Sequence, residues 1–161
     1  MQSNQALLEK FYKALQSRDA DTIAECYHPE AEFTDEVFRN LKGPEVTSMW
    51  RMLFGRSGDF AMEYRDIKAG PESGSGHWDA TYTFSSSGRK VLNRIDSAFQ
   101  FKDGLIFQQR DTFNFWKWSR QALGTTGLLL GWLPPFQKNV QKRSRGLLAN
   151  FMKKQGLTPG Q

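Results

Sequence analysis

The first third of the chain carries apolar residues at helical spacing. A stripe with a period of 3.6 residues runs over residues 7–15, and Ser3 lies where a helix N-cap is expected. A second, shorter helix is predicted for DADTIAECYH, residues 19–28, because Asp19 can cap its start and a proline follows it. A third helix is predicted over residues 43–55, between an opening Gly-Pro pair and a closing glycine.

From residue 60 onward the pattern alternates with a period of two, which indicates β-strands. Gly-rich or Ser-rich turns separate the alternating runs. Together with a short run at 31–35, the candidate strands are residues 60–67, 77–84, 90–101 and 105–116. Helices followed by a succession of antiparallel strands predict an α+β protein.

The last of these strands places a carboxylate on an apolar face. The turn KDG, residues 102–104, predicts a hairpin in which Ile95 lies opposite Asp111. The same register sets Asp96 opposite Arg110 as an exposed ion pair. The face that packs against the helices then carries Asp111 together with Asn93, Ile95, Phe99, Phe101, Phe107, Gln109 and Phe113.

Asp111 is therefore a candidate general acid or base. Burying a carboxylate without partners costs several kcal/mol or raises its pKa, and proteins do this chiefly where the group has a task. The alternative is a structural carboxylate that accepts hydrogen bonds from the first helix or from a helix N-terminus.

The inner face of strand 77–84 depends on the length of the turn that follows it. A three-residue turn directs His77, Asp79 and Thr81 inward. A turn of two or four residues directs Trp78, Tyr82 and Phe84 inward instead, and periodicity slightly favours this aromatic set. If His77 faces the pocket, it can assist proton transfer near neutral pH.

The charge of the chain is divided between two regions. Residues 1–111 carry a net charge of −3, whereas residues 112–161 contain eight Lys or Arg, no Asp or Glu, and a net charge of +8. After a short helical piece, WSRQALG, and a glycine-rich stretch, a longer amphipathic helix is predicted from Pro135. This basic helix can close over the body as a lid, pack on a partner subunit, or lie on an anionic membrane. Packing on the acidic body is the preferred interpretation.

Composition excludes several classes of protein. With 161 residues, 39% hydrophobic and 14% aromatic, the chain suits one folded domain with a real core. The single cysteine, Cys26, excludes an internal disulfide, and with only two histidines no metal site is expected. No nucleic-acid motif is present. No N-terminal secretion signal precedes the first helix, so a cytoplasmic protein is expected, and the longest apolar run, 127–136, is too short to span a bilayer.

The order of elements resembles the cone of the nuclear transport factor two-like superfamily. FYKALQSRDADTIAECYHPEAEFTD (11–35) and RIDSAFQFKDGLIFQQRDTFNFW (94–116) carry the resemblance, which is strongest to the SnoaL-like and epoxide-hydrolase branch. It implies a strongly curved mixed sheet wrapped around N-terminal helices. Residues 1–118 are expected to form this cone and residues 119–161 a C-terminal extension. A homodimer and the absence of a cofactor are also implied.

The resemblance assigns roles to single residues. Asp111 matches the aspartate that serves as acid or base in this branch, and Asp35 falls where ketosteroid isomerase keeps its proton-shuttling aspartate. His77 and Asp79 fall near the Arg-x-Asp of the epoxide hydrolase, with histidine in place of arginine. Tyr12 lies one position, about 100° around a helix, from the place of the isomerase's oxyanion-hole tyrosine.

These observations predict a cofactor-free acid/base enzyme acting on a small hydrophobic molecule, by isomerisation, aldol-type cyclisation or water addition. Asp111, Asp35 and His77 are the expected catalytic residues. The expected pocket residues are Tyr12, Tyr27, Trp50, Asp79, Asn93, Phe107, Gln109 and Phe113. The rival hypothesis is a non-catalytic module of the same fold that binds a small ligand or forms a dimer.

Overall fold

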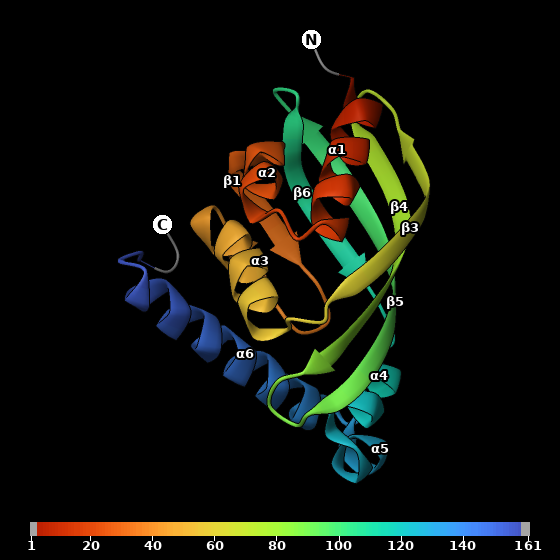
Figure 1. Cartoon of the computed structure of the whole chain (residues 1–161), viewed down its shortest axis with the longest axis vertical. Coiled ribbons are helices and arrows are strands. Elements are labelled where there is room, and N and C mark those ends of the chain that lie inside the picture. Colours follow the sequence, from red (N-terminus) through yellow and green to blue (C-terminus); the bar gives the residue numbers. More distant parts are fainter. Residues whose placement is uncertain (1–2, 159–161) are drawn as a thin grey trace.

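Three helices pack inside one curved sheet. The computed structural model describes residues 3–158 (Figure 1). The helices of the cone are α1 (Asn4–Gln16), α2 (Ala20–Cys26) and α3 (Pro44–Arg56). The side chains of Ser3 and Asp19 cap the first two, accepting from the backbone N–H of Ala6 and Thr22 at 3.1 Å each.

The described residues contribute six strands to the sheet. They are β1 (Tyr27–Thr34), β2 (Leu41–Lys42), β3 (Ala61–Ala69), β4 (Ser73–Phe84), β5 (Arg89–Lys102) and β6 (Leu105–Thr112). Their spatial order is β2-β1-β6-β5-β4-β3, and only β1 and β6 run parallel. The concave face wraps around α1 (Figure 1), so the predicted α+β cone with a curved mixed sheet is confirmed.

The hairpin β5–β6 has a different register from the predicted one. Its turn is Asp103-Gly104, both at positive φ (54° and 74°), and not the three-residue KDG loop. Phe107 has no partner in the ladder, so it forms a β-bulge between Ile106 and Gln108. As a result Asp111 lies opposite Ser97, and the predicted pairs Ile95–Asp111 and Asp96–Arg110 are wrong.

Strand β6 also ends earlier than the alternation predicted. It stops at Thr112, and α4 (Phe115–Leu123) begins at once. The Asn114 side chain accepts from the N–H of Lys117 at 2.9 Å, so a helix N-cap replaces the end of the strand.

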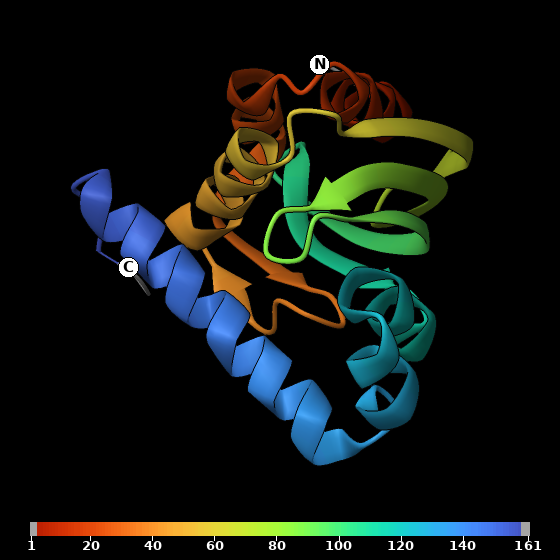
Figure 2. The ribbon, with the colours of Figure 1, turned by 60° about the horizontal axis from the view of Figure 1, so that its bottom comes forward.

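The C-terminal helices turn back over the open side of the cone. After α5 (Thr125–Leu130), the long helix α6 (Pro134–Lys154) runs beside α3 and the segment that follows β1 (Figure 2). Leu148 and Met152 are buried, and Arg145 pairs with the buried Glu45 at 3.2 Å. Gln141 donates to the Glu36 carbonyl at 3.0 Å. The apolar arc of α6 thus packs on the cone. Over residues 3–158, no helix combines the length and apolarity needed to cross a membrane.

Candidate functional site

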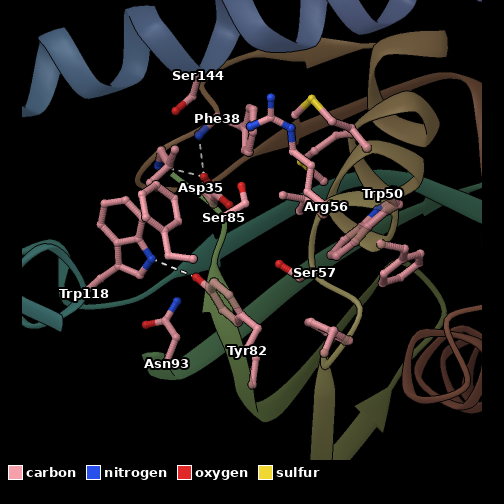
Figure 3. Close-up of a pocket in the computed structure, with 18 of the residues that line it drawn as sticks. Asp35, Phe38, Trp50, Arg56, Ser57, Tyr82, Ser85, Asn93, Trp118 and Ser144 are labelled. Carbon is pink, nitrogen blue, oxygen red and sulfur yellow. Dashed lines mark hydrogen bonds between the residues drawn. The ribbon is translucent and has the colours of Figure 1, made fainter. Parts of the chain in front are cut away.

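A cavity of about 140 Å³ lies between the concave face of the sheet and α3, α4 and α6 (Figure 3). Its walls are mainly aromatic and aliphatic, and two carboxylates, Asp35 and Asp111, reach them. This volume is close to that of an engineered apolar cavity that binds benzene. The enclosed space therefore admits a group about the size of one ring.

Asp111 is buried on the inner face of β6, as the alternation predicted, and only 2% of it is exposed. Ser97 donates to its Oδ1 at 2.6 Å and Gln109 donates to the same oxygen at 3.0 Å. No residue within 3–158 donates to Oδ2. One carboxylate oxygen is held by the sheet, and the other remains for a molecule in the cavity.

A chain of hydrogen bonds orients the groups behind Asp111. Trp50 Nε1 donates to the Tyr27 hydroxyl at 3.1 Å, and this hydroxyl donates to Oε1 of Gln109. The Gln109 amide is thereby oriented so that its N–H faces Asp111. Trp78 Nε1 donates to Ser97 at 3.1 Å, which orients the Ser97 proton in the same direction. Tyr27 and Gln109 position the carboxylate through these hydrogen bonds, and neither residue lines the cavity wall.

Asp35 follows β1 and also lines the cavity (Figure 3). The backbone N–H groups of Val37 and Phe38 donate to its Oδ1 at 2.7 and 2.5 Å. This Asx-type turn explains why the chain reverses between β1 and β2. Its second oxygen has no donor among residues 3–158, so Asp35 repeats the arrangement of Asp111.

The apolar surroundings change the acidity of both groups. Burial raises the pKa of Asp111 to about 6, against the hydrogen bonds from Ser97 and Gln109 that lower it. Burial, with a smaller contribution from the negative charge of Asp111, raises the pKa of Asp35 to about 7, against the two backbone hydrogen bonds. Near neutral pH one of the two carboxyl groups can therefore be protonated while the other is ionised.

Several polar groups line the cavity and can donate to a ligand: the Arg56 guanidinium, serine hydroxyls (Ser57, Ser85, Ser86 and Ser144), and the side chains of Tyr82 and Asn93. Trp118 Nε1 donates to the Tyr82 hydroxyl at 2.8 Å, and this hydroxyl has no acceptor among residues 3–158 (Figure 3). Burial raises the pKa of Tyr82 to about 12, against the Trp118 bond, and Asp35 raises it too, so the phenol keeps its proton. Asn93, 7% exposed, has no side-chain hydrogen bond to residues 3–158.

Tyr82 and Trp118 were not predicted as site residues. Tyr82 belongs to the aromatic set of strand 77–84 that faces inward if the following turn has two or four residues. The length of that turn was therefore the feature of the sequence that could have identified Tyr82. Trp118 is the last residue of the predicted cone and the first of the predicted helical piece WSRQALG, and the Asn114 cap shows that its helix begins earlier, at Phe115.

The expectation that His77 and Asp79 face the pocket is wrong. The turn between β4 and β5 has four residues, 85–88, which directs Trp78, Ala80, Tyr82 and Phe84 inward. His77 lies on the outer face, where its ring contacts Asp96 at 2.7 Å and Asp79 at 2.9 Å. Burial lowers the pKa of His77, but these two carboxylates outweigh burial and raise it above its usual value.

Three other expected pocket residues line the cavity and two do not. Trp50, Asn93 and Phe113 contribute to the wall. Phe107, at the bulge, packs edge-on against His28 and away from the cavity. Tyr12 lies in the core, stacked on Tyr64, and its buried hydroxyl has no partner among the described residues.

Residues 3–158 contain no cluster of three His, Cys, Asp or Glu side chains that could hold a metal ion. The groups that line the cavity include two carboxylates, a phenol, an amide, serine hydroxyls and the Arg56 guanidinium. They are suited to proton transfer and hydrogen bonding.

The cone and its acidic apolar cavity define an NTF2-like protein. Residues 8–109 match the SnoaL-like domain, and the chain belongs to this family. In sequence, no curated protein matches the chain.

Solved structures agree with this fold. An NTF2-like protein of unknown function from Burkholderia pseudomallei K96243 superposes with a TM-score of 0.66 at 16% identity, over 76% of this chain and 99% of the other. An LEH-like epoxide hydrolase from M. tuberculosis superposes with a TM-score of 0.63 at 22% identity, over 79% of this chain and 95% of the other. IdmH, a candidate polyketide cyclase from Streptomyces antibioticus, superposes with a TM-score of 0.62 at 15% identity, over 74% of this chain and 98% of the other. At these identities the likeness concerns the fold.

Proposed function

We propose that this protein is a cofactor-free acid/base enzyme that moves a proton on a small cyclic carbonyl compound. The observation that carries the proposal is the pair Asp35 and Asp111, which share the wall of one apolar cavity with pKa values near 7 and near 6. Environments that separate the pKa values of two titratable groups are typical of an acid and a base with distinct roles.

Asp111 acts as the base in this proposal. Its free Oδ2 removes a proton from the carbon next to the substrate carbonyl, and the C–H electron pair becomes the C=C bond of an enol. Asp35, in its protonated form, gives its proton to the carbonyl oxygen. Tyr82 and Asn93 are further donors to that oxygen, which gains negative charge in the transition state.

The second half of the reaction restores both groups. Asp111 returns its proton to a carbon of the enol, and the enol oxygen returns a proton to Asp35. Return to a different carbon is an isomerisation. In an aldol-type cyclisation the enol carbon instead attacks a second carbonyl carbon of the substrate, and the proton on Asp111 goes to the oxygen of that carbonyl. The named relatives, an epoxide hydrolase and a candidate cyclase, support acid/base chemistry in this fold.

Solvent deuterium exchange tests the proposal without knowledge of the natural substrate. Cyclic ketones and enones of one ring are first screened for thermal stabilisation, and the binders are then incubated with enzyme in D₂O and followed by NMR. Exchange at the carbon next to the carbonyl is expected with the natural sequence, and Asp111→Asn should lower its rate by about 10²–10⁴-fold. Asp103→Asn, in the exposed β5–β6 turn, is the matched control and should exchange at the natural rate.

Binding without exchange in the natural protein would favour the non-catalytic ligand-binding alternative. Equal exchange by the natural protein and Asp111→Asn would remove Asp111 from the mechanism.

A further inference from the structure

An exposed apolar surface lies on α5, which Figure 1 places at the end of the molecule remote from α1. It is formed by the α5 tip, defined here as residues 128–132, which joins α4 to α6. Leu128, Leu129, Leu130 and Trp132 are all exposed, with Trp132 at 64% and Leu129 at 62%. Large apolar side chains gathered in one exposed place mark an interaction site more often than chance exposure does.

The local packing keeps these leucines on the outside. A Cβ atom at Gly127 would lie 2.0 Å from the Ser119 carbonyl oxygen, and one at Gly131 would lie 2.0 Å from Ser119 Oγ. Gly127 and Gly131 therefore allow α5 and the turn after it to approach α4 closely. The short helix packs through its small residues, and its large apolar residues are left at the surface.

The indole N–H groups at the tip have partners inside the protein. The indole Nε1 of Trp132 donates to the Leu129 carbonyl at 3.0 Å, and Trp116 Nε1 donates to the Leu128 carbonyl at 3.1 Å. Because these groups are paired inside the protein, the tip can enter a less polar medium without leaving them unpaired.

The charges of the segment that carries the tip are all of one sign. Residues 112–161 contain eight Lys or Arg and no acidic residue. Arg120 stacks on Trp116 at 4.7 Å, beside the tip, and the exposed Lys117 and Lys138 lie on the helices that flank it. Leucine and tryptophan next to basic side chains match the interface of an anionic bilayer, where apolar groups enter and cations meet lipid phosphate or carboxylate groups.

The area of the tip fits a membrane better than a second protein. At these exposures its four side chains offer roughly 400 Å², about half of the 800 Å² that each partner buries in a stable protein complex. The apolar arc of α6 is not available for either purpose, because Leu148 and Met152 are buried against the cone.

We propose that the α5 tip inserts into the surface of anionic membranes and anchors the protein there reversibly. The proposal does not depend on the chemistry in the cavity, so each can fail without the other.

Co-sedimentation of the full chain with vesicles tests it. Binding to phosphatidylcholine vesicles that contain phosphatidylserine is expected at low salt, with an affinity at least about tenfold lower on pure phosphatidylcholine or at high salt. The double variant Leu129→Ser/Trp132→Ser should also bind at least about tenfold more weakly. Leu157→Ser, at an exposed leucine beyond the far end of α6, is the control and should bind like the natural chain.

Tryptophan fluorescence gives a second readout. Trp132 is the most exposed tryptophan, whereas Trp50, Trp78 and Trp118 are buried, so vesicles should shift the emission to shorter wavelength and Trp132→Phe should abolish the shift. The proposal is overturned if phosphatidylserine vesicles fail to bind at low salt, or if the double variant binds as well as the natural chain. Self-association in gel filtration that the double variant abolishes, without vesicle binding, would assign the tip to a second copy of the chain.

Discussion

The hydroxyl of Ser97 donates a 2.6 Å hydrogen bond to Oδ1 of Asp111, its partner across strands β5 and β6. The bond holds one carboxylate oxygen and leaves Oδ2 without a donor from residues 3–158. The sheet supplies too few hydrogen bonds to offset burial, and the pKa of Asp111 stays at about 6. A proton acceptor is thereby maintained inside an apolar wall.

Asp111→Asn is expected to stabilise the protein at alkaline pH. The folded state raises the pKa of Asp111 from 3.8 to about 6, so it binds this proton more tightly than the unfolded chain does. The free energy of unfolding therefore falls as pH rises through this range, and the loss is complete above it. Asparagine carries no charge and can still accept from Ser97 and Gln109.

Urea denaturation should show a gain of about 3 kcal/mol for Asp111→Asn at pH 8 and little gain at pH 4. The control Asp103→Asn should show no gain in stability at either pH. A loss of stability at pH 8 would mean that the Asp111 charge is compensated in the fold, contrary to the proposed role.

Asp35→Asn is expected to change the pH dependence of deuterium exchange. Asp111 is ionised above about pH 6, its pKa, and Asp35 is protonated below about pH 7, its pKa. The exchange rate of the natural protein should therefore follow a bell-shaped curve against pH, with its maximum between these two values. Asparagine cannot lose a proton, so the variant should keep the acid limb and lose the alkaline limb, with a rate lower by about 10²-fold at the optimum. An unchanged alkaline limb would assign that ionisation to another group.

The buried hydroxyl of Tyr12 is expected to cost stability. It has no hydrogen-bond partner among residues 3–158, so Tyr12→Phe should stabilise the protein by about 1 kcal/mol. Gly76 makes room for this hydroxyl, because a Cβ atom there would lie 2.5 Å from it. Gly76→Ala should therefore destabilise the protein by about 1–3 kcal/mol, and by less when Tyr12→Phe is also present.

Thermal denaturation of the two single variants and the double variant measures this coupling. Gly58→Ala is the control, because a Cβ atom there has no neighbour within 4 Å. Strict additivity of the two changes would contradict the close approach of Tyr12 and Gly76.

Arg145→Met is expected to loosen α6 from the cone. Arg145 is the cation that faces the buried Glu45, at 3.2 Å, and its loss leaves that carboxylate with a backbone donor from Lys42. Because Arg145 itself is half-exposed, the cost should be about 1–2 kcal/mol and not the full cost of breaking a buried pair. Hydrogen exchange of the α6 amides should become faster, whereas Arg143→Met, which has no carboxylate partner among residues 3–158, should leave it unchanged. Unchanged exchange in Arg145→Met would mean that apolar packing alone holds the helix.

Short-range patterns determined most of the secondary structure. The 3.6-residue stripe and the caps Ser3 and Asp19 predicted α1 and α2, and strict alternation predicted β3 to β6 with ends that differ by a few residues. The alternation also placed Asp111 on the inner face. These features depend on neighbours within a few positions, so they can be read from the chain alone.

The tertiary structure decided which of these residues meet. A single unpaired residue, Phe107, sets the register that joins Ser97 to Asp111, and a four-residue turn places Tyr82 inside and His77 outside. A change of one residue in a turn or bulge reverses every side chain beyond it, and local preference hardly distinguishes the alternatives. The meeting of Asp35 with Asp111 and the cover that α6 provides depend on contacts far apart in sequence, whose energies come from burial in the assembled fold.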